Sequence, residues 1–249
     1  MKGVLHYTKH QSAEHTGHKE PLLMFHGYGQ EASVFKSLDG YSFDLFFHGK
    51  SIWHDAEAPL EKSDWKALIA DFLEKNNIQK FRVLGFSMGG KFAMATLEAF
   101  PDRISEIILI APDGVKTSFW YSLATYPIAM RKVFKSMINN HKRFHRIASI
   151  ARKLGLIDKG VLRFVETQMN SEEKRKRVYY SWVVFRHMKF DIDKIAALIR
   201  DHNIDLRLYV GRHDKIIRPE NMKRLTSRFE ILDAGHNDLV KAYIKHIGT

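Results

Sequence analysis

The stretch Lys80-Phe-Arg-Val-Leu-Gly85-Phe-Ser87-Met-Gly89-Gly90-Lys-Phe-Ala-Met decides the fold of this chain. It begins as an apolar run with a β-branched residue, which predicts a strand, and it ends with the periodicity of an amphipathic helix. The motif G-x-S-x-G lies between the two. Glycines flank Ser87 because a sharp turn from strand to helix leaves no room for side chains. Such a turn lifts the serine hydroxyl clear of the sheet, so we predict that Ser87 is a nucleophile.

Short apolar runs alternate with amphipathic stretches on both sides of this motif. We predict strands at residues 3–8, 21–25, 41–47, 81–86, 104–110, 205–210 and 228–232, and helices at 62–76, 192–201, 219–225 and the C-terminal end. This rhythm is typical of an α/β protein with a mostly parallel central sheet flanked by helices. Between residues 115 and 189 only helical periodicity is present. The sequence therefore predicts a core of residues 1–114 and 190–249 interrupted by an all-helical insertion at 115–189.

The composition excludes several classes of protein. The chain has 249 residues, 45% of them apolar, which is enough for one large α/β core. No window approaches the 18 consecutive apolar residues that indicate a membrane-spanning helix. The absence of cysteine excludes disulfides, zinc thiolates and a thiol nucleophile. The first twenty residues contain no apolar signal segment, so we expect a cytoplasmic protein.

The excess of positive over negative charge is confined to the predicted insertion. Residues 116–189 contain 17 Lys and Arg against 4 Asp and Glu, whereas the rest of the chain contains 23 and 24. Three interpretations remain open: the insertion attracts an anionic substrate such as a carboxylate ester or an acyl-CoA thioester, it contacts an anionic membrane, or it only promotes solubility. Nucleic acid is not expected as a partner, because no recognition motif accompanies the charge.

Two residues have the chemistry and the position to activate Ser87. A nucleophilic serine needs a base and a carboxylate that orients the base. Asp214 follows the predicted strand 205–210, and His236 follows the strand 228–232. Because the carboxyl ends of parallel strands lie at one edge of a sheet, these side chains are expected to meet there.

The order Ser87, Asp214, His236 resembles the catalytic triad of the α/β-hydrolase superfamily. Further similarities are His-Gly-Tyr-Gly at 26–29, Asp-Leu-Phe-Phe-His-Gly-Lys-Ser at 44–51 and Gly-Arg-His-Asp-Lys-Ile-Ile-Arg-Pro at 211–219. The resemblance covers nearly the whole chain and identifies residues 115–189 with the cap or lid of the family. It also implies an oxyanion hole made by the backbone N–H groups of Met88 and Tyr28.

The resemblance implies a serine hydrolase that cleaves a small-molecule ester or a related acyl compound through an acyl-enzyme. It requires neither a metal nor an organic cofactor. Two alternatives stay open, because related families use the same triad for cofactor-free hydrolysis or lyase-type cleavage of C–C bonds, and a protein of this fold can bind a ligand without catalysis.

Other interpretations of single residues also remain. Ser87 could be an ordinary helix N-cap and His236 an ordinary surface histidine, although their contexts favour catalysis. Asp113, after the strand 104–110, is an alternative triad acid, since some members of the family place the acid there. Only one strand precedes the strand that leads to His26, so we expect a sheet shorter by one edge strand. Four histidines between residues 6 and 18 match no metal-binding spacing.

Overall fold

The computed structural model describes residues 2–11, 20–55, 57–116, 119–138 and 169–248, and the single positions 140, 143, 146 and 149. The chain divides into two compact units. Unit 1 comprises residues 1–55, 60–116 and 188–249, and unit 2 comprises residues 56–59 and 117–187. The division therefore lies two residues inside each end of the predicted insertion. The short segment 56–59 also belongs to unit 2, which the sequence did not predict.

Unit 1 is built on a seven-stranded sheet with the strand order β2-β4-β3-β6-β7-β8-β9. Strand β2 runs antiparallel to β4, and all other neighbours are parallel. The central strands are almost entirely apolar because helices cover both of their faces. The strands are β2 (Tyr7–His10), β3 (Leu22–Phe25), β4 (Gly40–Phe43), β6 (Phe81–Phe86), β7 (Ile104–Ile110), β8 (Asp205–Gly211) and β9 (Glu230–Leu232).

The N-terminal strands differ from the prediction. The strand expected at residues 3–8 is two strands, because β1 (Gly3–Val4) pairs antiparallel with β5 (Ile52–Trp53) while β2 joins the edge of the main sheet. Only β2 therefore joins the main sheet ahead of β3, and the expectation of one strand before β3 in that sheet is confirmed.

The strand predicted at 41–47 ends early, at Phe43. Asp44 is buried, and its carboxylate accepts hydrogen bonds from the N–H groups of Ala32 at 2.8 Å and Lys50 at 2.9 Å. These bonds fold the chain back at Asp44, so residues 44–47 turn instead of continuing the strand.

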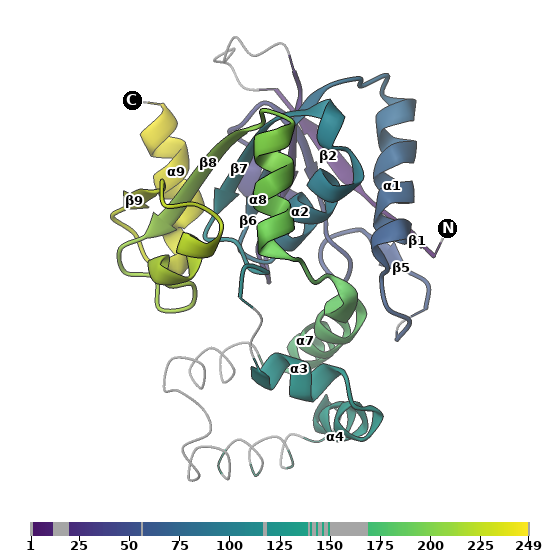
Figure 1. Ribbon diagram of the computed structural model, residues 1–249. Helices are drawn as coiled ribbons and strands as arrows, with labels where there is room; N and C mark the ends of the chain where they lie inside the picture. Colours follow the sequence, from purple (N-terminus) through teal and green to yellow (C-terminus); the bar gives the residue numbers. More distant parts are fainter. Residues whose placement is uncertain are drawn as a thin grey trace. The chain divides into compact units, whose positions relative to one another are not determined.

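Helices cover both faces of the sheet. On one face α1 (Lys62–Lys75), α2 (Gly89–Ala99) and α8 (Ile192–Asp201) pack in a row, whereas α9 (Leu239–Ile247) packs near β8 and β9 (Figure 1). Alternation along β3 separates the faces, because Phe25 contacts Trp65 of α1 and Met24 lies in the cluster beneath α9. The helix predicted at 219–225 is a short 3-10 helix, η4 (Pro219–Arg224).

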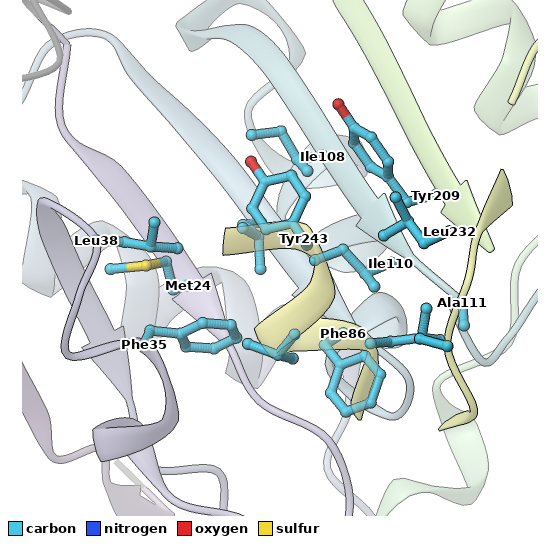
Figure 2. Close-up of a cluster of buried hydrophobic side chains, with 14 of the residues drawn as sticks. Met24, Phe35, Leu38, Phe86, Ile108, Ile110, Ala111, Tyr209, Leu232 and Tyr243 are labelled. Atoms are coloured by element: carbon cyan, nitrogen blue, oxygen red, sulfur yellow. The ribbon is translucent and has the colours of Figure 1, made fainter. Parts of the chain in front are cut away.

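The apolar cluster beneath α9 joins distant parts of the chain. Figure 2 shows Tyr243 of α9 beside Ile108 and Ile110 of β7, with Phe35 and Leu38 approaching from the segment after β3. Phe35 comes from a short 3-10 helix, η1 (Ala32–Phe35). This packing fixes the start of α9, which begins three residues after His236, against the carboxyl ends of the strands.

Unit 2 is helical in its described part. It contains α3 (Phe119–Thr125), α4 (Ile128–Ile138), α7 (Glu172–Val184) and the 3-10 helix η3 (Phe185–His187). Ser171 caps the start of helix α7, because its hydroxyl accepts the N–H of Lys174 at 3.2 Å. Among the residues that the structure describes, every helix of either unit is too short or too polar to cross a bilayer.

Candidate active site

Ser87 occupies the turn between β6 and α2 with a φ of +49°. A positive φ is strained for any residue with a side chain, so the surrounding backbone must hold it in place. Its N–H donates to the carbonyl of Ile110 at 2.9 Å. Its carbonyl accepts the N–H groups of Gly90 and Asp113, each at 2.8 Å. The end of β7 and the residues after it therefore hold the strained turn through both the N–H and the carbonyl of Ser87.

The glycines of the motif are required by close backbone contacts. A Cβ atom added at Gly89 would lie 1.9 Å from the carbonyl oxygen of Phe25, and one at Gly85 would lie 2.7 Å from the carbonyl oxygen of Gly89. Helix α2 therefore packs directly on strands β3 and β6. This contact explains the G-x-S-x-G pattern that the sequence shows.

His236 lies between Ser87 and Asp214. Its Nε2 is 2.9 Å from the Ser87 Oγ, and its Nδ1 is 2.6 Å from the Asp214 Oδ2. The Asp214 side chain is fully buried, and the His236 side chain is 12% exposed. The three residues come from the ends of β6, β8 and β9, and the structure brings them together as the sequence predicted.

Backbone donors hold the Asp214 carboxylate in one orientation. Its Oδ1 accepts the N–H groups of Ile216 at 2.7 Å and Ile217 at 2.9 Å, which leaves Oδ2 facing the imidazole. A buried carboxylate needs such partners to remain charged. The arrangement fits an imidazole whose Nδ1 carries a proton and whose Nε2 is free to accept one from Ser87.

The alternative acid, Asp113, lies elsewhere. Its carboxylate pairs with the Nζ of Lys91 at 2.8 Å and accepts the N–H of Gly114 at 2.7 Å. Lys91 is a nearly buried residue of α2. Asp113 contributes to the site through its backbone N–H, which contacts the carbonyl of Ser87, and its carboxylate does not contact His236.

The two residues expected at the oxyanion hole lie in separate turns. Met88 directly precedes α2, where the first N–H groups of a helix lack intrahelical acceptors. Tyr28 lies in the turn after β3, closed by the Gln30 N–H donating to the Gly27 carbonyl at 3.3 Å. Gly29 in this turn has a φ of +76°, which glycine adopts without strain.

His26 is a structural residue of this region. It is buried, its Nδ1 bonds to the Gly27 carbonyl at 2.7 Å, and its Nε2 accepts the N–H of Leu45 at 3.0 Å. Burial lowers the pKa of His26 to about 4, so its ring is neutral near pH 7. With both nitrogens engaged by the backbone, His26 is not available as a base.

The other histidines singled out in the sequence have local partners. His213 pairs with Asp233 at 3.0 Å on the surface, His6 contacts Asp44, and His10 contacts Ser42. His15 and His18 lie outside the described residues. Within the described ranges, the acidic and histidine side chains form no cluster suited to a metal ion.

Sequence reasoning missed two residues that shape the site. The ring of Phe86, directly before Ser87, lies 5.2 Å from the imidazole of His236, and a Cβ at Gly27 would lie 2.7 Å from the Phe86 ring. The side chain of Gln30 accepts the N–H of Gly27 at 3.1 Å. Both residues stand next to a motif in the sequence, which is a signal that they belong to the site, but only the structure shows their contacts.

Comparisons with known proteins agree on the family. The sequence profile described as alpha/beta hydrolase fold matches residues 20–243. A Mycoplasma genitalium protein whose name describes it as an esterase/lipase is 27% identical over 135 residues, which cover 51% of this chain and 48% of that protein. The chain spans about half the length of the curated relatives that it matches first.

Solved structures share the fold at low sequence identity. A thermophilic esterase from Thermogutta terrifontis has a TM-score of 0.66 and 17% identity, covering 98% of this chain and 90% of that chain. A meta-cleavage product hydrolase from Pseudomonas fluorescens has a TM-score of 0.60 and 16% identity, covering 98% and 91%. With the profile match over most of its length, this chain belongs to the alpha/beta hydrolase fold family.

Proposed function

We propose that this protein is a serine hydrolase that cleaves an ester or a related acyl compound. The observation that carries the proposal is the position of His236, whose two nitrogens lie 2.9 Å from Ser87 Oγ and 2.6 Å from Asp214 Oδ2. A hydroxyl that contacts an imidazole, which in turn contacts a buried carboxylate, is the arrangement of an activated nucleophile.

In the proposed reaction the Ser87 oxygen attacks the substrate carbonyl carbon while His236 Nε2 takes the hydroxyl proton. Asp214 stabilises the resulting imidazolium through Nδ1, while the N–H groups of Ile216 and Ile217 hold its other oxygen in place. The imidazolium then gives its proton to the leaving alcohol as the C–O bond breaks. Water, deprotonated by the same imidazole, hydrolyses the acyl-enzyme and releases the acid.

Two backbone N–H groups are assigned to the oxyanion. Met88 N–H, at the start of α2, and Tyr28 N–H, in the turn after β3, would stabilise the charge that develops on the carbonyl oxygen. The turn that carries Tyr28 is held in place by His26, whose ring bonds to both the Gly27 carbonyl and the Leu45 N–H. This support for the turn favours the role of its N–H group as an oxyanion donor. Loss of one such donor typically slows acyl transfer by ~10²–10³.

The experiment is hydrolysis of p-nitrophenyl esters from acetate to palmitate by the wild type and by Ser87→Ala. We expect turnover that peaks at one acyl length and disappears in Ser87→Ala and in His236→Ala. A fluorophosphonate probe should label the wild type at Ser87 and leave Ser87→Ala unlabelled. Thr96→Ser, a conservative change of another buried hydroxyl, serves as the control and should keep activity.

The test also separates the alternatives. Turnover that persists in Ser87→Ala would remove the proposal. A phosphonate-reactive Ser87 without turnover of any ester would instead favour C–C bond cleavage on the same three residues. A protein with neither reactivity would be a ligand-binding member of the family.

A further inference from the structure

Helix α4 (Ile128–Ile138) has two different faces. Phe134 and Ile138 are buried, and the Phe134 ring lies 5.2 Å from the Tyr179 ring and 5.8 Å from the Trp182 ring of α7. This inner face is the hydrophobic contact that holds α4 in unit 2. Ile128, Lys132 and Val133, in contrast, are exposed.

The outer face of α4 exposes large apolar side chains. Ile128 is 65% exposed, Val133 is 44% exposed and Met130 is 37% exposed. Leu123 of the neighbouring α3 is 36% exposed. A single exposed apolar residue is ordinary in a folded protein, but several on one short helix usually indicate an interaction surface.

Positive charge lies on the same face. Lys132 is four residues after Ile128 and next to Val133, it is exposed, and no acidic side chain in the described part of the chain pairs with it. Lys135 pairs with Glu57, and the guanidinium of Arg131 donates to the carbonyls of Thr125 and Tyr126. These two acceptors are neutral carbonyls rather than carboxylates.

The charge of α4 belongs to a larger pattern. Unit 2 contains 15 Lys and Arg against 5 Asp and Glu, whereas unit 1 contains 25 against 23. The two acidic residues at the start of α7, Glu172 and Glu173, already pair with Lys176 and Arg177. Unit 2 therefore carries a strong positive field that these acids do not cancel.

We propose that the outer face of α4 docks on the surface of an anionic lipid bilayer. Ile128 and Val133 would enter the headgroup region, while Lys132 and the neighbouring cations contact lipid phosphates and carboxylates. A nucleic acid would satisfy the cations but offers no apolar layer to an isoleucine. The apolar and cationic residues on one helix face therefore favour a bilayer over a nucleic acid.

This inference goes beyond the proposed function and does not depend on it. Docking is measured with the full chain carrying Ser87→Ala, so a failure of the esterase proposal leaves the binding result readable. Hydrolysis of a short soluble ester, measured with the docking substitutions in an active background, should stay at the wild-type rate because α4 contributes none of the proposed catalytic residues.

The experiment is co-sedimentation with phosphatidylcholine vesicles prepared with and without phosphatidylserine, at low and high salt. We expect binding only to the vesicles that contain phosphatidylserine, and weaker binding at high salt. Ile128→Ser should weaken it roughly tenfold through lost apolar burial. Lys132→Glu should weaken it by about 25-fold, since each unit of charge near the surface contributes about fivefold.

Matched controls come from unit 1. Ile52→Ser changes an isoleucine that is 55% exposed, and Lys66→Glu reverses the charge of an exposed helical lysine. Both should bind vesicles like the parent protein. No binding to phosphatidylserine vesicles at low salt, or equal losses in Ile128→Ser and Ile52→Ser, would overturn the proposal. Binding to RNA as tight as to vesicles and insensitive to Ile128→Ser would also overturn it, in favour of a simple polyanion site.

Discussion

The buried His26 predicts a specific dependence of stability on pH. Burial lowers its pKa from 6.5 to about 4, so the folded protein keeps this ring neutral while the unfolded chain protonates it below pH 6.5. Proton binding therefore favours the unfolded state, and stability falls as pH decreases from 6.5 toward 4. At one pKa unit per ~1.4 kcal/mol, the full effect is about 3 kcal/mol.

Most of this loss of stability occurs between pH 7 and pH 5. Between pH 7 and pH 5 the same two pKa values give a loss of about 2 kcal/mol in the free energy of unfolding. His26→Gln removes the titrating group. It should destabilise the protein at pH 7, because the bonds to Gly27 and Leu45 are disturbed, and this destabilisation should shrink by about 2 kcal/mol at pH 5.

Urea unfolding at both pH values measures the effect. His213→Gln is the control, since His213 is 64% exposed and its removal should leave the pH dependence within about 0.5 kcal/mol of wild type. Imidazole resonances from labelled protein report the His26 charge directly. A destabilisation by His26→Gln that is equal at pH 7 and pH 5, or a folded-state titration near 6.5, would refute the reasoning.

Three further predictions follow from single contacts. Asp214→Asn should lower kcat by about 10³–10⁴-fold, because it disturbs the tautomer of the His236 imidazole. Asp113→Asn should keep more than a tenth of the wild-type activity. Equal losses of the two variants in ester assays would contradict the assignment of Asp214 as the acid. Gly89→Ala should lower the melting temperature by roughly 2–10 °C, because its Cβ would overlap the Phe25 carbonyl. An unchanged transition in calorimetry would contradict this, because it would mean that α2 moves away from β3 without loss of stability. Thr96→Val removes the acceptor of the Trp65 indole N–H, a buried bond of 3.0 Å, and should cost about 1–3 kcal/mol in urea unfolding, whereas Thr96→Ser should cost less.

The central sheet could be predicted from the sequence because its signals are local and strong. The strands before Ser87 and before Asp113 are mostly apolar, and the glycines after them mark the turns. The candidate site followed from the same signals, since Asp214 and His236 stand directly after strands. A general rule of parallel sheets then placed their side chains at one edge.

The N-terminal strands could not be predicted, because their stability comes from distant partners. Strand β2 has the polar sequence Tyr-Thr-Lys-His and is ordered by pairing with β4. Strand β1 has two residues and depends on Trp53 and its neighbour. A short edge strand carries no periodic pattern, so the sequence could not separate the two.

The choice between Asp113 and Asp214 also required the structure. Both aspartates follow a strand on the same sheet edge, and the sequence favoured Asp214 only by resemblance. The decisive contact involves Lys91, a nearly buried cation on α2 that neutralises Asp113. A pairing between residues on different elements leaves no mark in the local sequence pattern.

The pairing of β7 with β8 has a consequence for how the chain folds. These strands are neighbours in the sheet, yet all of residues 111–204 separate them, including most of unit 2. The sheet is therefore completed only when this long loop closes, which favours slow folding. The entropic cost of closure rises by only about 0.6 kcal/mol per doubling of loop length. Gly114 and Phe190 lie close together at its base, so an insertion of another length could be accommodated there with little loss of stability.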